Sequence, residues 1–142
     1  MGAIINSLHV KEDDLERLEA NGISTITIDR AQFSHAYSAL AIDHIHGGYL
    51  ATKHLIEVGG AKKIAFLSGP QDESSSQDRY QGYLRAISET DAEHIVKLYG
   101  LFDSQSGYQA SYDYLSEHTD IDGIVCSNDA MAYGVIRACA DL

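Results

Sequence analysis

The sequence contains no run of roughly 18 consecutive apolar residues, the length that would indicate a membrane-spanning helix. Its first residues, MGAIINSLHVKEDD, also do not have the basic-then-apolar layout of a signal peptide. Both absences predict a cytoplasmic protein that makes no membrane contact. Basic residues are few, since 10 Lys and Arg stand against 21 Asp and Glu and give a net charge of −11. A negative net charge does not suit a surface that neutralises DNA phosphates, so we expect that this segment does not itself bind nucleic acid.

Cysteines and catalytic motifs are scarce too. The two cysteines, Cys126 and Cys139, form no CxxC pair and lie in apolar runs, which predicts reduced core thiols. Motifs of the GxSxG, GxxxxGK[ST], GxGxxG and HExxH types are missing, so no enzyme class is indicated. His44, His46 and His54 match no familiar zinc-ligand spacing, and we interpret them as ordinary polar residues. We therefore expect no catalysis, metal or cofactor.

The chain has 142 residues, of which 44% are hydrophobic, enough for one ordinary globular core. Short β-branched runs alternate with stretches of helical period, and this alternation predicts a doubly wound, three-layer α/β/α fold with a parallel sheet. The expected strands are 3–6, 24–29, 39–43, 63–68, 94–100 and 123–127. The expected helices are 12–20, 48–58, 77–88, 105–117 and 130–140.

Apolar residues at spacings of three and four predict which helix faces cover the sheet. These residues are Leu50, Ala51, His54, Leu55 and Val58 in one helix and Tyr80, Tyr83, Leu84 and Ile87 in the next.

Small and polar residues mark the expected starts and ends of the helices. Asn21-Gly22 and Gly59-Gly60 are typical helix stops, and Asp103 or Ser104 offers an N-cap. Gly47-Gly48 at a helix start is compatible with anion binding, although we favour tight packing on the sheet. The polar passage 30–37 is either a crossing between two lobes or an ordinary loop.

Polar side chains follow several expected strands, and ligands of open parallel sheets bind beyond the carboxyl ends of the strands. Asp29 ends one strand, Ser74–Ser76 follow another, and Asn128 and Asp129 follow a third. Arg79 lies nearby, at the start of the next helix. Carboxylates, an amide and a forked guanidinium donor suit a small molecule rich in hydroxyl groups.

Each of these residues also has a structural interpretation. Asn128 or Asp129 can cap the last expected helix, and Asp29 can be a solvated loop carboxylate. Ser74–Ser76 can be a flexible polar loop. Arg79 is a cation in the first turn of the expected helix, where the helix dipole disfavours it, and this favours a role facing a ligand.

Several stretches resemble regulators of the lactose-repressor (LacI/GalR) family. AIDHIHGGYLATKHLIEVGGAKKIAFLSGP is similar to their segment from hinge to second lobe, although Gly59-Gly60-Ala61 replaces the usual Gly-His. SSSQDRYQGYLRAI resembles a helix start of the family, and IDGIVCSNDAMAYGVIRA resembles its strand, Asn-Asp and helix signature. ISTITIDR resembles the strand of the first lobe that ends in an aspartate.

The resemblance implies a type I periplasmic-binding-protein-like fold with two lobes. Residues 1–42 would be part of the first lobe and 43–142 most of the second. The DNA-binding headpiece would lie outside this sequence, which resembles the middle of a regulator.

The resemblance also implies effector contacts by Asp29, Ser75, Arg79 and Asn128, with Asp129 as a neighbouring support or cap. The effector would be a sugar or sugar phosphate, and the protein would act as a homodimer that reaches operator DNA only through the headpiece. A sugar-binding protein of a transport system with the same fold is the alternative. A small-molecule enzyme is disfavoured because no paired general acid and base converge.

Overall fold

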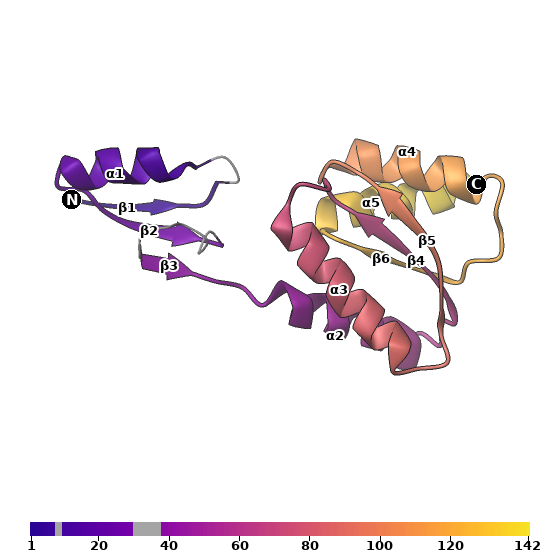
Figure 1. The fold of residues 1–142 in the computed structure, drawn as a ribbon. Coiled ribbons are helices and arrows are strands. Elements are labelled where there is room, and N and C mark those ends of the chain that lie inside the picture. Colours follow the sequence, from indigo (N-terminus) through magenta and orange to yellow (C-terminus); the bar gives the residue numbers. More distant parts are fainter. Residues whose placement is uncertain (8–9, 30–37) are drawn as a thin grey trace. The chain divides into compact units, whose positions relative to one another are not determined.

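The computed structural model describes residues 1–7, 10–29 and 38–142. Within it the chain forms two compact units, Met1–Asp43 and His44–Leu142 (Figure 1). The passage 30–37, which we expected to be a lobe crossing or a loop, lies outside the described residues. No helix in the described ranges is long and apolar enough to span a bilayer.

In its described residues, the first unit is a parallel three-stranded sheet with one helix. Its elements are β1 (Gly2–Ile5), α1 (Glu12–Ala20), β2 (Ser24–Ile28) and β3 (Ser38–Leu40), and the strand order is β1-β2-β3. Along β2, Thr25 and Thr27 are buried while Ile26 between them is exposed. Leu15 of α1 is fully buried, so the buried side of this sheet is the side that carries α1.

The second unit is a three-layer sandwich with helices on both faces of its sheet. Its elements are α2 (His44–Glu57), β4 (Lys63–Ser68), α3 (Ser74–Ser88), β5 (Glu93–Tyr99), α4 (Ser104–Leu115), β6 (Gly123–Cys126) and α5 (Asp129–Asp141). The parallel sheet has the order β5-β4-β6, with α2 and α3 on one side and α4 and α5 on the other (Figure 1). The expected doubly wound α/β class is confirmed.

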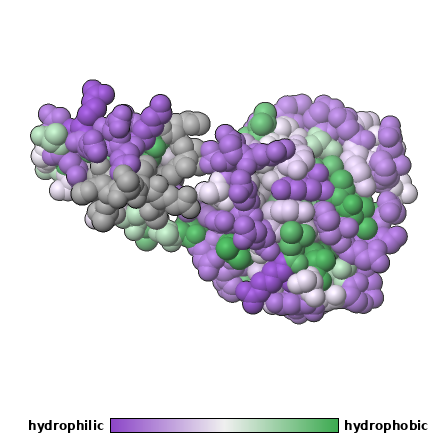
Figure 2. All heavy atoms as spheres, in the orientation of Figure 1, coloured by the Kyte–Doolittle hydropathy of each residue, from purple (hydrophilic) through white to green (hydrophobic). Residues whose placement is uncertain are grey.

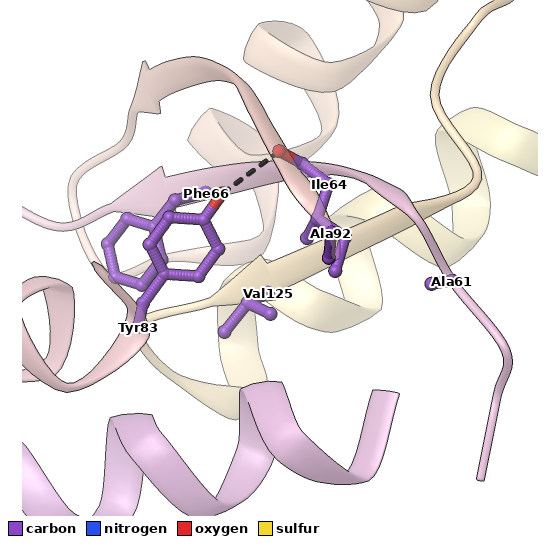
Figure 3. Close-up of a cluster of buried hydrophobic side chains, with 6 residues drawn as sticks. All are labelled: Ala61, Ile64, Phe66, Tyr83, Ala92 and Val125. Carbon is purple, nitrogen blue, oxygen red and sulfur yellow. Dashed lines mark hydrogen bonds between the residues drawn. The ribbon is translucent and has the colours of Figure 1, made fainter. Parts of the chain in front are cut away.

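The central strand β4 holds the core of this unit. Ile64 and Phe66 pack with Tyr83 on the α2/α3 side, and the Tyr83 hydroxyl donates a hydrogen bond of 2.9 Å to the Ile64 carbonyl (Figure 3). Leu67 points to the opposite side and packs with Met131. Burial on both faces explains why β4 reads as a continuous apolar run instead of an alternating one.

Glycines let the helices of each pair approach closely. A Cβ at Gly48 would overlap the backbone of α3, and one at Gly82 would overlap the backbone of α2. On the other side of the sheet, a Cβ at Gly107 or Gly134 would overlap the facing backbone of α5 or α4. Both pairs of covering helices are therefore in contact at small residues.

Because of this close contact, the buried face of α2 differs from the predicted one. The buried residues of α2 are His44, Gly48 and Thr52, whereas Leu50 and Val58 are exposed. Ala51 and His54 are exposed as well, and of the predicted stripe only Leu55 packs against the core. The prediction ranked residues by hydrophobicity, but a helix that touches its neighbour at backbone distance places its smallest residues inward. In α3 the prediction did better, because Tyr80, Tyr83 and Ile87 join the core and only Leu84 is exposed.

Several boundaries also differ from the prediction. Helix α2 begins at His44, so Gly47 and Gly48 lie inside the helix and do not open it. Ser74–Ser76 form the first turn of α3 and are not a loop. Strand β3 is Ser38–Leu40 instead of 39–43. The stop at Asn21-Gly22 is confirmed, with Gly22 at φ 72°.

Candidate functional site

A pocket of about 340 Å³ lies at the carboxyl ends of β4 and β6 in the second unit. Phe66 and Val125 supply apolar surface from the sheet, and α2 contributes its glycine-rich first turns. The complete lining is Gly47, Gly48, Ala51, Phe66, Arg79, Val125, Cys126, Ser127, Asn128 and Asp129. An apolar base with a few convergent polar groups is typical of small-molecule sites.

Arg79 enters the pocket from α3. It is the sixth residue of that helix, because α3 begins at Ser74, and it is half-buried. The expected position in the first helical turn is therefore wrong, and the argument from the helix dipole no longer applies. What positions Arg79 is the close contact with α2, where Gly48 lies against the Arg79 backbone.

Asn128 is fixed by two hydrogen bonds of its side chain. Its Oδ1 accepts from the Met131 backbone N–H at 2.9 Å, which makes Asn128 the N-cap of α5. Its Nδ2 donates to the Phe102 carbonyl at 2.9 Å. The capping interpretation of Asn128 is thus what the structure shows, and one amide hydrogen remains for any further partner. Asp129 follows as the first residue of α5, where the helix dipole favours a carboxylate.

The other two predicted residues lie elsewhere. Ser75 is half-buried in the first turn of α3 and is not part of the pocket lining. Asp29 belongs to the first unit, directly after β2, where its backbone adopts φ 61° and its N–H donates to the Leu40 carbonyl at 2.7 Å. The second unit therefore brings together Arg79, Asn128 and Asp129 of the five predicted residues.

The sequence did not point to Phe102 or Ser127. Phe102 has a positive φ of 65°, its carbonyl receives the Asn128 amide, and its ring fills the space in front of Gly69 at the end of β4. Ser127 lines the pocket and is 4% exposed. A signal for Ser127 was present, since it lies two residues after the core residue Val125 and so shares its side of the sheet.

The two cysteines differ in burial, and so do His44 and His54. Burial raises the pKa of the Cys126 thiol to about 12. Cys139 is exposed, so the expectation of a second core thiol is wrong. His44 is buried, whereas His54 is exposed. The residues that the structure describes contain no group of three or more side chains that could hold a metal ion.

A doubly wound unit with a pocket beyond its strand ends is typical of α/β domains that bind small molecules. The family described as periplasmic binding protein domain matches residues 7–142, and the chain belongs to this family. Among curated proteins, the chain is 30% identical over 140 residues to the HTH-type transcriptional repressor PurR of Mannheimia succiniciproducens. That match covers 96% of this chain and 42% of the repressor, so the chain spans about two-fifths of its relative. The resemblance to LacI-type regulators is thereby confirmed.

Solved structures show the same fold. A periplasmic solute-binding protein of an ABC transporter from Actinobacillus succinogenes, with bound D-allose, has a TM-score of 0.89 and 22% identity. It is matched over 99% of this chain and 54% of its own. A sugar-binding LacI-family regulator from Escherichia coli, in complex with phosphate, has a TM-score of 0.76 and 23% identity over 99% of this chain and 51% of its own. These relatives are regulators and binding proteins.

Proposed function

We propose that this chain is part of the effector-sensing domain of a cytoplasmic LacI-type transcriptional repressor of a carbohydrate operon. The observation that carries the proposal is the pocket in which Arg79, Asn128 and Asp129 converge from α3 and the start of α5. Their donors and acceptors suit a sugar or sugar phosphate. Similar structures described as a solute-binding protein with bound D-allose and as a sugar-binding regulator support this ligand class, and the repressor relative supports the regulatory role. The site senses its ligand and performs no catalysis.

In this proposal, Met1–Asp43 is part of the first lobe and His44–Leu142 is most of the second. Asp29 and Ser75, which do not line this pocket, are the other two effector contacts that we propose from the family resemblance. The intact protein is a homodimer whose helix-turn-helix headpieces bind operator DNA, while this acidic chain with its net charge of −11 makes no DNA contact. The effector shifts the population of lobe arrangements by binding one of them more tightly.

Loss of Arg79 tests the site. In the intact protein, Arg79→Ala removes a charged hydrogen-bond donor, and such bonds contribute about 1.5–3 kcal/mol, so affinity should fall about ten- to a hundredfold. Calorimetric titration with the inducing sugar measures the change. Arg85→Ala is the matched control, because Arg85 lies on the same helix but is exposed and donates to Glu89 at 3.1 Å. Equal affinities of the two variants would remove Arg79 from the site.

A sugar-binding protein of a transport system is the second candidate. The D-allose-bound transport protein with its TM-score of 0.89 favours it. Proteins with these two functions differ in whether they bind DNA. A repressor shifts the mobility of its own upstream DNA and is released or tightened by its ligand, whereas a transport protein does neither. A sequence-selective, ligand-dependent gel shift of the intact protein supports the repressor, and its absence supports transport.

A further inference from the structure

Ser127 carries a buried hydroxyl group that the protein leaves unpaired. Its backbone N–H continues the ladder of β6 by donating to the Leu67 carbonyl at 2.9 Å. Its side chain is 4% exposed, yet Oγ has no hydrogen-bond partner. Among the described residues only Thr25 and Ser76 share this condition. Buried hydroxyls in native proteins are nearly always paired, so each exception requires a partner from outside the chain or an explanation.

The Ser127 hydroxyl lies on the side of the sheet where the pocket opens. Val125 packs into the core cluster between the sheet and α2/α3, and side chains two residues apart on an extended strand share a face. Phe66 of the neighbouring strand belongs to the same cluster and also lines the pocket. Ser127 is therefore part of the same wall as Val125, and it lines the pocket that Arg79 also lines.

The charges around this pocket favour an uncharged ligand. Arg79 and Asp129 are the two charged lining residues, and their formal charges cancel. A phosphate dianion would gain Arg79 but would also lie in a pocket that contains the Asp129 carboxylate. The net charge of −11 on the whole chain adds a field that repels anions. A neutral hydroxyl group meets neither penalty and can both donate to and accept from a serine hydroxyl.

We propose that Ser127 is a ligand contact that determines specificity in this pocket, with its Oγ paired to a hydroxyl group of an uncharged, polyhydroxylated effector beside Arg79. The inference rests on the proposed effector-binding function and narrows it in two ways. It names a contact outside the five residues predicted from the sequence, and it selects a neutral sugar over a sugar phosphate. Ser127 then contributes affinity because the ligand supplies the bond that the protein does not.

Two alanine variants of the intact protein distinguish the loss of a ligand contact from the general effect of removing a buried hydroxyl group. Ser127→Ala deletes the pocket hydroxyl. Ser76→Ala is the matched control, because Ser76 is 1% exposed and equally unpaired but does not line the pocket. Calorimetric titration uses D-allose, D-ribose and D-fructose as neutral probes, and glucose 6-phosphate and inorganic phosphate as anionic probes. We expect wild type and Ser76→Ala to bind a neutral probe equally and Ser127→Ala to bind it about tenfold more weakly.

The other possible outcomes contradict different claims. Wild-type affinity in Ser127→Ala for the neutral sugar overturns the inference and leaves the effector-binding function intact. Binding of glucose 6-phosphate or phosphate in preference to every neutral probe overturns the choice of an uncharged ligand. An equal loss in both serine variants shows a general effect of the substitutions and also overturns the inference. A wild-type protein that binds none of the five probes contradicts the proposed function itself.

Discussion

The two sheets of this chain bury their strands to different extents. In β4 of the second unit, all residues from Ile64 to Ser68 are buried, and Ile64 itself is 0% exposed. In β2 of the first unit, buried and exposed residues alternate, and Ile26 is 46% exposed. Both strands are central and parallel on both sides. The difference therefore comes from the layers above and below the sheet.

Helices cover both faces of the sheet in the second unit, whereas the described part of the first unit contains only α1. The uncovered side of the first sheet presents Ile4, Ile26 and Leu40, which are 74%, 46% and 59% exposed. On the second unit, apolar residues of the visible face lie in separate small groups among polar ones (Figure 2). Parallel sheets are normally buried on both faces. The more completely buried core of the described chain is therefore that of the second unit.

The same truncation in the two sheets tests this conclusion with the largest expected effect. Ile64→Ala removes a fully buried side chain from β4 and should cost about 4 kcal/mol of unfolding free energy. Ile26→Ala removes a side chain that is already half in water and should cost about 1 kcal/mol or less. Urea unfolding followed by circular dichroism measures both. Similar losses for the two variants would show that Ile26 is buried in solution and that the two units do not differ as described.

The glycine contacts between helices are the next feature of the second unit to test. A Cβ at Gly82 would overlap the Ile45 carbonyl and lie 2.6 Å from the Tyr49 nitrogen, so Gly82→Ala must push α3 away from α2. Overpacking of this kind costs about 2 kcal/mol. Gly47→Ala is the control, because no atom lies within 4 Å of a Cβ there and alanine is the better helix former. We expect Gly47→Ala to be neutral or stabilising in the same urea experiment.

Destabilisation by Gly47→Ala as large as that by Gly82→Ala would contradict the close contact. It would indicate that any side chain in this part of the helix pair is harmful. A neutral Gly82→Ala would show that the two helices separate readily, and the position of Arg79, whose backbone faces Gly48, would then be less well fixed.

Much of the fold could be predicted because its signals are local. The run KIAFLS has the length and composition of a strand buried on both faces, and β4 is Lys63–Ser68 as expected. Asp103 caps α4 by accepting from the Ser106 N–H at 2.7 Å, as one of two proposed caps. The inward face of α2 could not be predicted, because it depends on the distance to α3. That distance is a tertiary quantity that hydrophobic period does not encode.

For the candidate site, the rule that ligands bind beyond strand ends pointed to Asn128 and Asp129, with Arg79 nearby at the start of the next expected helix. The structure places these three residues in the lining of one pocket. The rule could not separate a capping role from a ligand role for Asn128, because both need the same residue at the same place. Phe102 was missed because its position depends on a positive φ and on the Asn128 amide 26 residues away in sequence.

The smallest expected effect is a pH dependence that weakens the second unit alone. His94 Nδ1 lies 2.8 Å from the Tyr83 hydroxyl, which itself donates to the Ile64 carbonyl at 2.9 Å. Because that hydroxyl has one hydrogen, His94 acts as the donor to it. Burial and the nearby charge of Lys97 lower the pKa of His94 below its ordinary value of 6.5. The folded protein therefore binds this proton less readily than the unfolded chain does.

The sign of the effect on stability follows from that direction. Above about pH 6.5 the imidazole is neutral in both states and its contribution is fully present. As the pH falls below this value, the unfolded state takes up the proton first, so the unfolding free energy decreases until the folded pKa is passed. His94→Gln keeps a side-chain amide donor near Tyr83 but does not titrate. Urea unfolding of both proteins at a series of pH values between 7.5 and 5 should show a smaller decline for His94→Gln, because the other titrating groups are common to the two chains. Parallel declines would mean that His94 has the same pKa in the folded and unfolded states and that its contact with Tyr83 does not depend on its charge.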